Sequence, residues 1–176
     1  YISELLTLPE KMQKALEDKE RIQWFAAKYA NAHDVFFVGR GVDYAVCLEG
    51  SLKLKEISYI NANGYAAGEL KHGPIALLDE NMPVMAVLGP GITLPKMISN
   101  CEEAKARNAL LAAVVSEKAD IAPGLFDYRL NIPDTNETTF PLLANIPLQL
   151  LAYYIADSLG REVDQPRNLA KSVTVE

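Results

Sequence analysis

The sequence predicts an α/β protein in which a parallel sheet lies between two layers of helices, a three-layer αβα sandwich. Short apolar runs of strand length alternate along the chain with longer segments of helical periodicity, and this alternation is typical of parallel sheets covered on both faces. The chain has 176 residues, of which 49% are hydrophobic and 23% charged, and this composition indicates one globular domain. We expect a helical segment at 1–33, an α/β core at 34–160 and a C-terminal tail at 161–176.

The first elements of this fold are two helices and a strand. Residues 1–32 carry apolar side chains at helical spacing in two pieces, and Pro9 suits the first turn of a helix. Residues 34–39 form a short apolar run that ends in glycine, which predicts a buried parallel strand. The sequence Gly-Arg-Gly at 39–41 favours a tight turn into a helix. It does not match a dinucleotide-binding fingerprint, because Tyr44 stands where the third glycine would be.

The remaining elements follow the same alternation. Apolar runs at 83–88 and 110–115 predict two further strands, and 128–132 predicts a less regular one. Helical periodicity predicts a helix at 94–107 and a long apolar helix at 141–159, ended by a glycine. The segment that begins at Val163 has no periodicity, so we expect it to be extended.

A charged stripe marks the helix that follows the Gly-Arg-Gly turn. At about 100° per residue, Glu49, Lys53 and Glu56 lie within about 60° of one another on a helical wheel. Apolar residues flank this stripe on both sides, with Val46, Ile57 and Ile60 on one and Ala45, Leu48, Leu52 and Tyr59 on the other. Burying ions is costly unless they are used, so this stripe is a candidate site. The alternative is that the stripe contains only ordinary ion pairs of a solvated helix, at spacings of three and four residues. The sequence leaves both interpretations open.

His72 is one of only two histidines and the second candidate. The Gly-Pro that follows it cannot continue a helix, so we expect His72 at a loop or helix end, where an imidazole can meet a ligand. A purely structural histidine is the alternative. Cys47 and Cys101 are too few and too far apart for a disulfide framework or a zinc site, and we interpret Cys47 as a packing residue.

Several function classes are disfavoured by composition. The net charge of −6 and the lack of a Lys/Arg cluster argue against nucleic acid as a partner. No apolar run approaches the roughly 20 residues of a membrane span, and no secretory signal is present. We therefore expect a soluble, cytoplasmic protein.

Four motifs resemble the C-terminal part of the glucosamine-6-phosphate synthase family, the glutamine–fructose-6-phosphate aminotransferases. The resemblance extends from about Val38 to Glu176, is weakest between Gly89 and Phe140, and points to the second of two tandem SIS (sugar isomerase) domains. It implies a flavodoxin-like fold with a five-stranded parallel sheet. The motifs are LEGSLKLKEISY, YAAGELKHGP, PLQLLAYYIA and DQPRNLAKSVTVE.

The resemblance also implies a reaction. In this family fructose 6-phosphate is opened, ammonia is added at C2, and the product is isomerised to glucosamine 6-phosphate, with no metal or redox cofactor. The matching motif positions imply Glu56 as the proton shuttle between C1 and C2, His72 in ring opening and Lys171 as the Schiff-base lysine. They also imply Glu49 and Lys53 as supporting groups and two substrate contacts in the tail, Asn168 and Ala170.

The resemblance implies partners as well: a sugar phosphate substrate, a glutaminase domain, a first SIS domain and a second copy in a homodimer. The chain starts at Tyr1 rather than at a cysteine nucleophile, so we do not expect it to hydrolyse glutamine. The segment 89–95 has one hydroxyl, two prolines and no cation, which makes it a poor phosphate cradle. We expect the phosphate to be bound by the first SIS domain.

Two other functions remain open on the sequence alone. A non-catalytic SIS module would bind a sugar phosphate for regulation or assembly, and it would need a phosphate loop. A purely structural dimerisation half would be favoured if Glu56 and Lys171 lay far apart.

Overall fold

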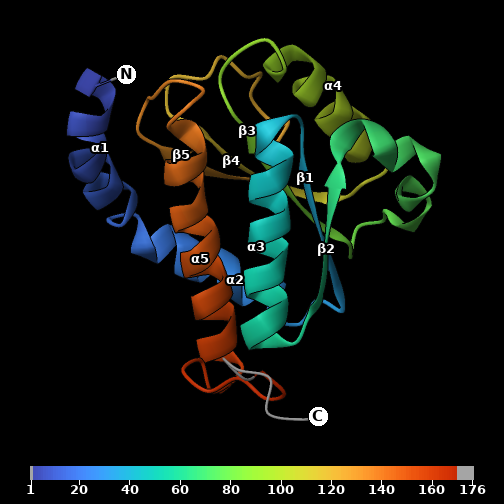
Figure 1. Cartoon of the computed structure of the whole chain (residues 1–176). Coiled ribbons are helices and arrows are strands. Elements are labelled where there is room, and N and C mark those ends of the chain that lie inside the picture. The colour runs from blue at the N-terminus through green and yellow to red at the C-terminus, as the bar shows by residue number, and fades with distance from the viewer. Residues whose placement is uncertain (1, 170–176) are drawn as a thin grey trace, which may run out of the picture.

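A computed structural model of the chain describes residues 2–169 and contains a five-stranded sheet in the order β2-β1-β3-β4-β5. Every neighbouring pair of strands runs parallel, which confirms the predicted α/β fold (Figure 1). The strands are β1 (Asp34–Gly39), β2 (Asn61–Ala66), β3 (Pro83–Leu88), β4 (Leu110–Ser116) and β5 (Tyr128–Ile132).

Helices cover both faces of this sheet and form two separate apolar cores with it. One core contains side chains from α1, α2, α3 and α5, and the other contains side chains from α4 and the short 3₁₀ helix η1. Figure 1 shows α3 and α5 side by side in front of the sheet. The helices are α1 (Ile2–Ala15), α2 (Lys19–Tyr29), α3 (Val42–Ser58), η1 (Ala67–His72), η2 (Pro74–Leu77), α4 (Leu94–Lys105) and α5 (Phe140–Ser158).

The central strands are buried from end to end, as their continuous apolar runs predict. All six residues of β3 are buried, because its alternate side chains enter the two cores on opposite faces. Met85 and Val87 pack toward the α3–α5 side, whereas Val84 and Ala86 pack toward α4. This layering predicts that a polar substitution on either face of β3 disrupts packing.

Strand β2 is the element that the sequence patterns did not indicate. Its residues, NANGYA, include two asparagines and a glycine, which are uncommon in strands, and no apolar run marks it. All six residues nevertheless pair in register with the six residues of β1. β2 lies at the sheet edge, where only one side of the ladder needs a partner, so backbone pairing decides its structure here rather than its own side chains.

Two features of the helices differ from expectation. Helix α3 ends at Ser58, so Tyr59 and Ile60 lie beyond it rather than on it. Pro9 lies in the interior of α1 and not in a first turn, because α1 already begins at Ile2. The other boundaries agree with expectation within two residues, and Gly160 has a φ of 62° just past the end of α5, as a helix-ending glycine should.

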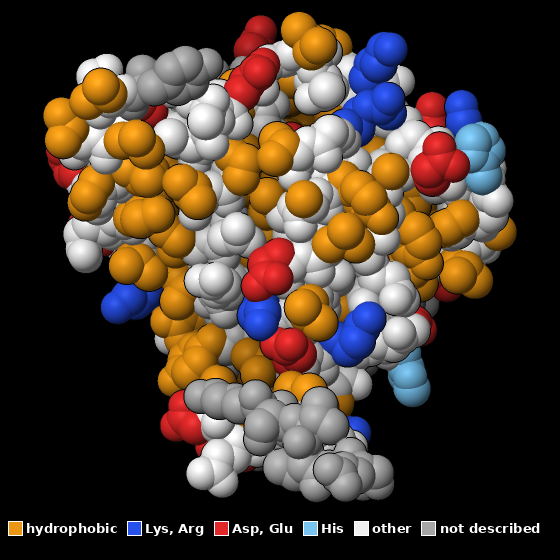
Figure 2. Space-filling view, in the orientation of Figure 1, with side chains coloured by type: hydrophobic (Ala, Val, Ile, Leu, Met, Phe, Trp, Pro, Cys, Tyr) orange, Lys and Arg blue, Asp and Glu red, His pale blue; other side chains and the backbone are white. Residues whose placement is uncertain are grey.

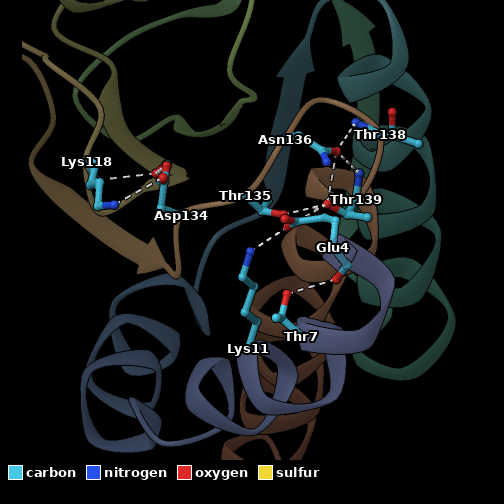
Figure 3. Close-up of polar contacts among 10 residues, drawn as sticks. Glu4, Thr7, Lys11, Lys118, Asp134, Thr135, Asn136, Thr138 and Thr139 are labelled. Atoms are coloured by element: carbon cyan, nitrogen blue, oxygen red, sulfur yellow. Dashed lines mark hydrogen bonds and ion pairs between the residues drawn. The ribbon is translucent and has the colours of Figure 1, made fainter. Parts of the chain in front are cut away.

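A polar cluster ties α1 to the loop between β5 and α5 (Figure 3). The Glu4 carboxylate accepts hydrogen bonds from the Thr135 hydroxyl, from the Thr139 hydroxyl at 3.3 Å and from the Lys11 ammonium at 2.5 Å. In the same loop the Asn136 side-chain oxygen accepts the Thr139 backbone N–H at 3.1 Å. Hydrogen bonds to Glu4 of α1 therefore hold this loop where it enters α5.

Candidate functional site

Helix α3 brings the three residues of the charged stripe together, as the sequence predicts. The Lys53 ammonium lies 2.6 Å from a carboxylate oxygen of Glu56 and 3.8 Å from one of Glu49. The hydrogen bond to Glu56 raises the pKa of Lys53 above its ordinary value, and the charge of both carboxylates adds to this effect. Lys53 is therefore a positively charged ammonium at neutral pH, held beside two carboxylates.

The stripe is less buried than the wheel suggests. The side chains of Glu49, Lys53 and Glu56 are 42%, 35% and 27% exposed. On one flank Val46 is buried, but on the other Leu48 and Leu52 are each 44% exposed. The expectation of charges surrounded by buried apolar surface is therefore wrong for this chain on its own.

Hydrophobic side chains gather on the same face of the molecule. Figure 2 shows them around charged side chains on the surface formed by α3 and α5. Besides Leu48 and Leu52, this surface includes Leu142 and Tyr153 of α5, which are 46% and 45% exposed. Large exposed apolar patches with polar groups among them are typical of interaction sites. The charged stripe thus lies in a surface suited to being covered.

His72 lies where the sequence places it, at the end of a helix, but not against the stripe. It closes η1 beyond the edge strand β2, and its Nδ1 is 2.8 Å from a carboxylate oxygen of Glu69. Its side chain is 60% exposed. Among residues 2–169 no hydrogen bond or ion pair joins His72 to Glu49, Lys53 or Glu56.

The C-terminal tail is described only up to Leu169. Asn168 is exposed and has a φ of 63°, so the chain turns there. Ala170 and Lys171, the other two tail residues implied in the site, lie outside the described residues. Directly before them, the Arg167 backbone N–H donates a hydrogen bond of 2.9 Å to the Tyr59 hydroxyl. The helical pattern identifies Tyr59 only as an apolar flank of the helix and gives no sign of this contact.

A second polar site lies where the strand order reverses. β1 and β3 are neighbours, and the chain leaves their carboxyl ends toward opposite sides of the sheet, which is where α/β proteins of this kind bind ligands. A small pocket of about 150 Å³ is present there. Its lining consists of Arg40, Gly41, Val42, Asp43, Gly89, Pro90, Ile92, Thr93 and Glu137.

The charges that line this pocket disfavour a phosphate, because one cation, Arg40, stands beside two carboxylates, Asp43 and Glu137. Asp43 is only 4% exposed, and its carboxylate accepts the Gly89 N–H at 2.8 Å, a donor that a phosphate would otherwise use. Burial raises the pKa of Asp43 to about 6; the Gly89 hydrogen bond opposes this, and the charge of Glu137 adds to it. Two carboxylates therefore line the pocket, in agreement with the poor phosphate cradle that the sequence indicates at 89–95. Asp43 itself does not stand out in the sequence.

Membrane-spanning helices and clustered metal ligands are both absent from residues 2–169. Within that range no helix is both long and apolar enough to cross a membrane. The same residues contain no group of three or more histidine, cysteine or acidic side chains placed to hold a metal ion.

Comparisons with known proteins agree with the sequence motifs. Residues 28–156 match the SIS domain family. The chain is 51% identical over 175 residues to "Glutamine--fructose-6-phosphate aminotransferase [isomerizing]" of Caldanaerobacter subterraneus subsp. tengcongensis, covering 99% of this chain and 29% of that protein. It is 49% identical over 176 residues to the protein of the same name from Methanosarcina acetivorans, covering 100% of this chain and 28% of that protein. The chain thus spans less than a third of the length of these curated relatives.

Solved structures show the same relationship. The C-terminal domain of glucosamine-fructose-6-phosphate aminotransferase from Francisella tularensis superposes with a TM-score of 0.89 at 38% identity, covering 94% of this chain and 47% of that one. Tagatose-6-phosphate ketose/aldose isomerase from Escherichia coli shares the fold, with a TM-score of 0.74 at 16% identity, covering 96% of this chain and 47% of that one. The family match, the five-stranded parallel sheet and these structural neighbours together show that the chain belongs to the SIS domain family.

Proposed function

We propose that this chain is the second SIS domain of a glutamine–fructose-6-phosphate aminotransferase and carries the proton-transfer part of its isomerase site. The observation that carries the proposal is identity of about half over nearly the whole chain to proteins of that name. This chain covers 47% of the Francisella tularensis C-terminal domain. That share supports the proposal that this chain is one part of a larger unit, which also holds a second region of similar size. The whole reaction requires that missing region and a source of ammonia.

The charged stripe supplies the acid–base chemistry in this proposal. Glu56 moves the proton between C1 and C2 of the opened sugar, because a carboxylate can accept the proton at one carbon and return it at the other. Lys53, at 2.6 Å, holds the Glu56 carboxylate in place, and Glu49 helps to hold Lys53 from the other side. Lys171 forms the imine with C2, since a lysine amine can add to a ketose carbonyl. Asn168 and Ala170 contact the substrate.

The exposed position of the stripe fits a site completed by other parts of the protein. We propose that the first SIS domain binds the phosphate, because two carboxylates, Asp43 and Glu137, line the pocket between the carboxyl ends of β1 and β3 in this chain. His72 opens the sugar ring in the site of a neighbouring subunit, which fits its 60% exposure and its separation from the stripe. This arrangement requires a homodimer. A stand-alone sugar-phosphate-binding module is disfavoured by the same pocket.

The proposal includes the organisation and location expected from the sequence. The chain acts as one SIS domain with a helical segment at 1–33, a core at 34–160 and a tail at 161–176. It works in the cytoplasm on a sugar phosphate and needs no metal or redox cofactor.

The test is an assay of the intact protein that contains this chain, supplied with fructose 6-phosphate and glutamine. We expect glucosamine 6-phosphate to form. In Glu56→Gln the side chain keeps its shape but cannot carry the proton, so isomerisation should fall by about 10²–10⁴-fold while substrate binding persists. Glu102→Gln, which changes an exposed glutamate on α4, is the matched control and should keep full activity. No product from the wild type would refute the proposed function, and an unchanged rate in Glu56→Gln would assign the proton transfer to another group.

A further inference from the structure

Helix α1 carries an apolar face that no other part of residues 2–169 covers. Its inner face packs on the domain through Leu8 and Ala15, which are 8% and 5% exposed. On the opposite side of the helix Ile2 and Leu6 are 78% and 77% exposed, and Leu5 at the rim of this side is 55% exposed. Figure 2, in the orientation of Figure 1, shows hydrophobic side chains gathered at the upper left, where α1 lies.

This apolar surface is confined to the first half of α1. A single exposed apolar side chain is common on a folded protein and needs no explanation. The outer side of α1, however, changes from apolar in its first half to polar in its second half, where Glu10, Gln13 and Lys14 are exposed. Glu10 and Lys14 form an ion pair of 2.9 Å there. The second half is therefore a solvated helix surface, whereas the first half has the composition of a covered one.

Polar contacts hold the first half of α1 in its orientation. The Glu4 carboxylate, on the inner side of the helix, accepts hydrogen bonds from the Lys11 ammonium and from the Thr135 and Thr139 hydroxyls (Figure 3). The hydrogen bond from Lys11, followed by the one from Thr135, lowers the pKa of Glu4, so this carboxylate is charged at neutral pH. The apolar face cannot turn inward without breaking these contacts. A partner must therefore come to it from outside the domain.

We propose that Ile2, Leu5 and Leu6 dock on an apolar patch of the first SIS domain of the same protein. Helix α1 is the first element of this chain, so a domain that precedes the chain is joined directly to this face and meets it at a high effective concentration. A second copy of the chain has no such advantage. The Francisella tularensis C-terminal domain has room for such a partner, because this chain covers only 47% of it.

Docking of α1 gives the site a fixed geometry. The proposed phosphate-binding half lies in the first SIS domain and the proposed proton-transfer half lies in this one. A helix that is held by its inner side on one domain and by its outer side on the other sets the distance between the two halves. This inference rests on the proposed function, in which the first SIS domain precedes this one.

The first test measures how fast a thiol on α1 reacts with a maleimide in the intact protein. Leu6→Cys places the thiol in the apolar face, and the matched control Glu10→Cys places it one turn later on the same side, where the side chain is 71% exposed. The native Cys47 and Cys101 are buried, and mass spectrometry assigns each label to its peptide. Each rate is divided by that of the same thiol in the unfolded protein. A docked face opens rarely, so labelling at position 6 should be at least about tenfold slower than at position 10.

The second test identifies what covers the face. Leu5→benzoylphenylalanine places a photoreactive group at the rim of the apolar face, and peptide mapping after illumination shows what it reaches. We expect a cross-link to a peptide that precedes Tyr1 in the intact protein. A cross-link that joins two copies of the chain, or protection that disappears on dilution, would assign the face to self-association and overturn the proposal.

The remaining outcomes also decide the question. Equal labelling rates at positions 6 and 10 would show that the face is uncovered and refute the docking. Protection without a cross-link to the preceding region would refute the first SIS domain as the partner. If the wild type forms no glucosamine 6-phosphate, the proposed function fails, whereas the labelling rates and the cross-link still decide whether α1 docks on the region before it.

Discussion

Replacement of the buried Asp43 by asparagine should stabilise the protein at neutral and alkaline pH. The Asp43 carboxylate is 4% exposed and accepts the Gly89 N–H at 2.8 Å. An asparagine oxygen can accept the same hydrogen bond without carrying a buried charge. The substitution therefore removes the cost of desolvating an ion and keeps the local geometry.

The size of the effect follows from the pKa. Burial raises the pKa of Asp43 from 3.8 to about 6. Between these two values the folded state binds more protons than the unfolded state, so the contribution of this group to stability falls as the pH rises and stays low above about pH 6. At about 1.36 kcal/mol per unit, the ionised Asp43 destabilises the fold by about 3 kcal/mol at pH 8. Near pH 4 the folded Asp43 is protonated, and most of the penalty is gone.

The assay is denaturant unfolding of wild type and Asp43→Asn between pH 4 and pH 8. We expect similar free energies of unfolding at the acidic end and a variant that is more stable by about 3 kcal/mol at the alkaline end. Asp120→Asn, at an exposed position, should follow the wild type throughout. A difference between wild type and Asp43→Asn that does not change with pH would show that Asp43 does not titrate as a buried acid, and the reasoning would be wrong.

Three other predictions concern assembly and chemistry. The exposed apolar surface on α3 and α5, with Leu48, Leu52 and Tyr153 each 44–45% exposed, predicts a homodimer; light scattering that gives a 19.4 kDa monomer at high micromolar concentration would contradict it. Borohydride treatment of the intact protein with fructose 6-phosphate should trap an adduct on Lys171, and Lys171→Arg should abolish it; an adduct on another lysine would reassign the imine. The 176-residue chain alone should show negligible synthase activity even with added ammonium, and micromolar affinity for fructose 6-phosphate by calorimetry would argue against that expectation.

Much of the fold is determined by local sequence. The strands β1, β3 and β4 are buried on both faces, so each must be a continuous apolar run, and each is recognisable as one. The charged stripe is equally local, because residues three and four apart on a helix must be neighbours. Helical spacing by itself therefore groups Glu49, Lys53 and Glu56.

The edge strand and the exposure of the stripe depend on partners that the local sequence does not contain. β2 has no apolar pattern of its own, and its pairing with β1 decides its conformation. The wheel places the stripe between two apolar flanks, but only tertiary packing shows that Val46 is covered by the core while Leu48 and Leu52 are not. A helical wheel gives directions around an axis and carries no information about what lies there.

Contacts between distant segments are decided by the tertiary structure alone. Tyr59 and Arg167 are separated by 108 residues, and a hydrogen bond joins them. Asp43 and Gly89 are separated by 46 residues, and their contact depends on the crossover that brings β1 and β3 side by side. Such contacts follow from the path of the chain through the sheet, whereas periodicity and spacing report only on residues that are close in sequence, which is why the stripe is visible in the sequence and the contact between Tyr59 and Arg167 is not.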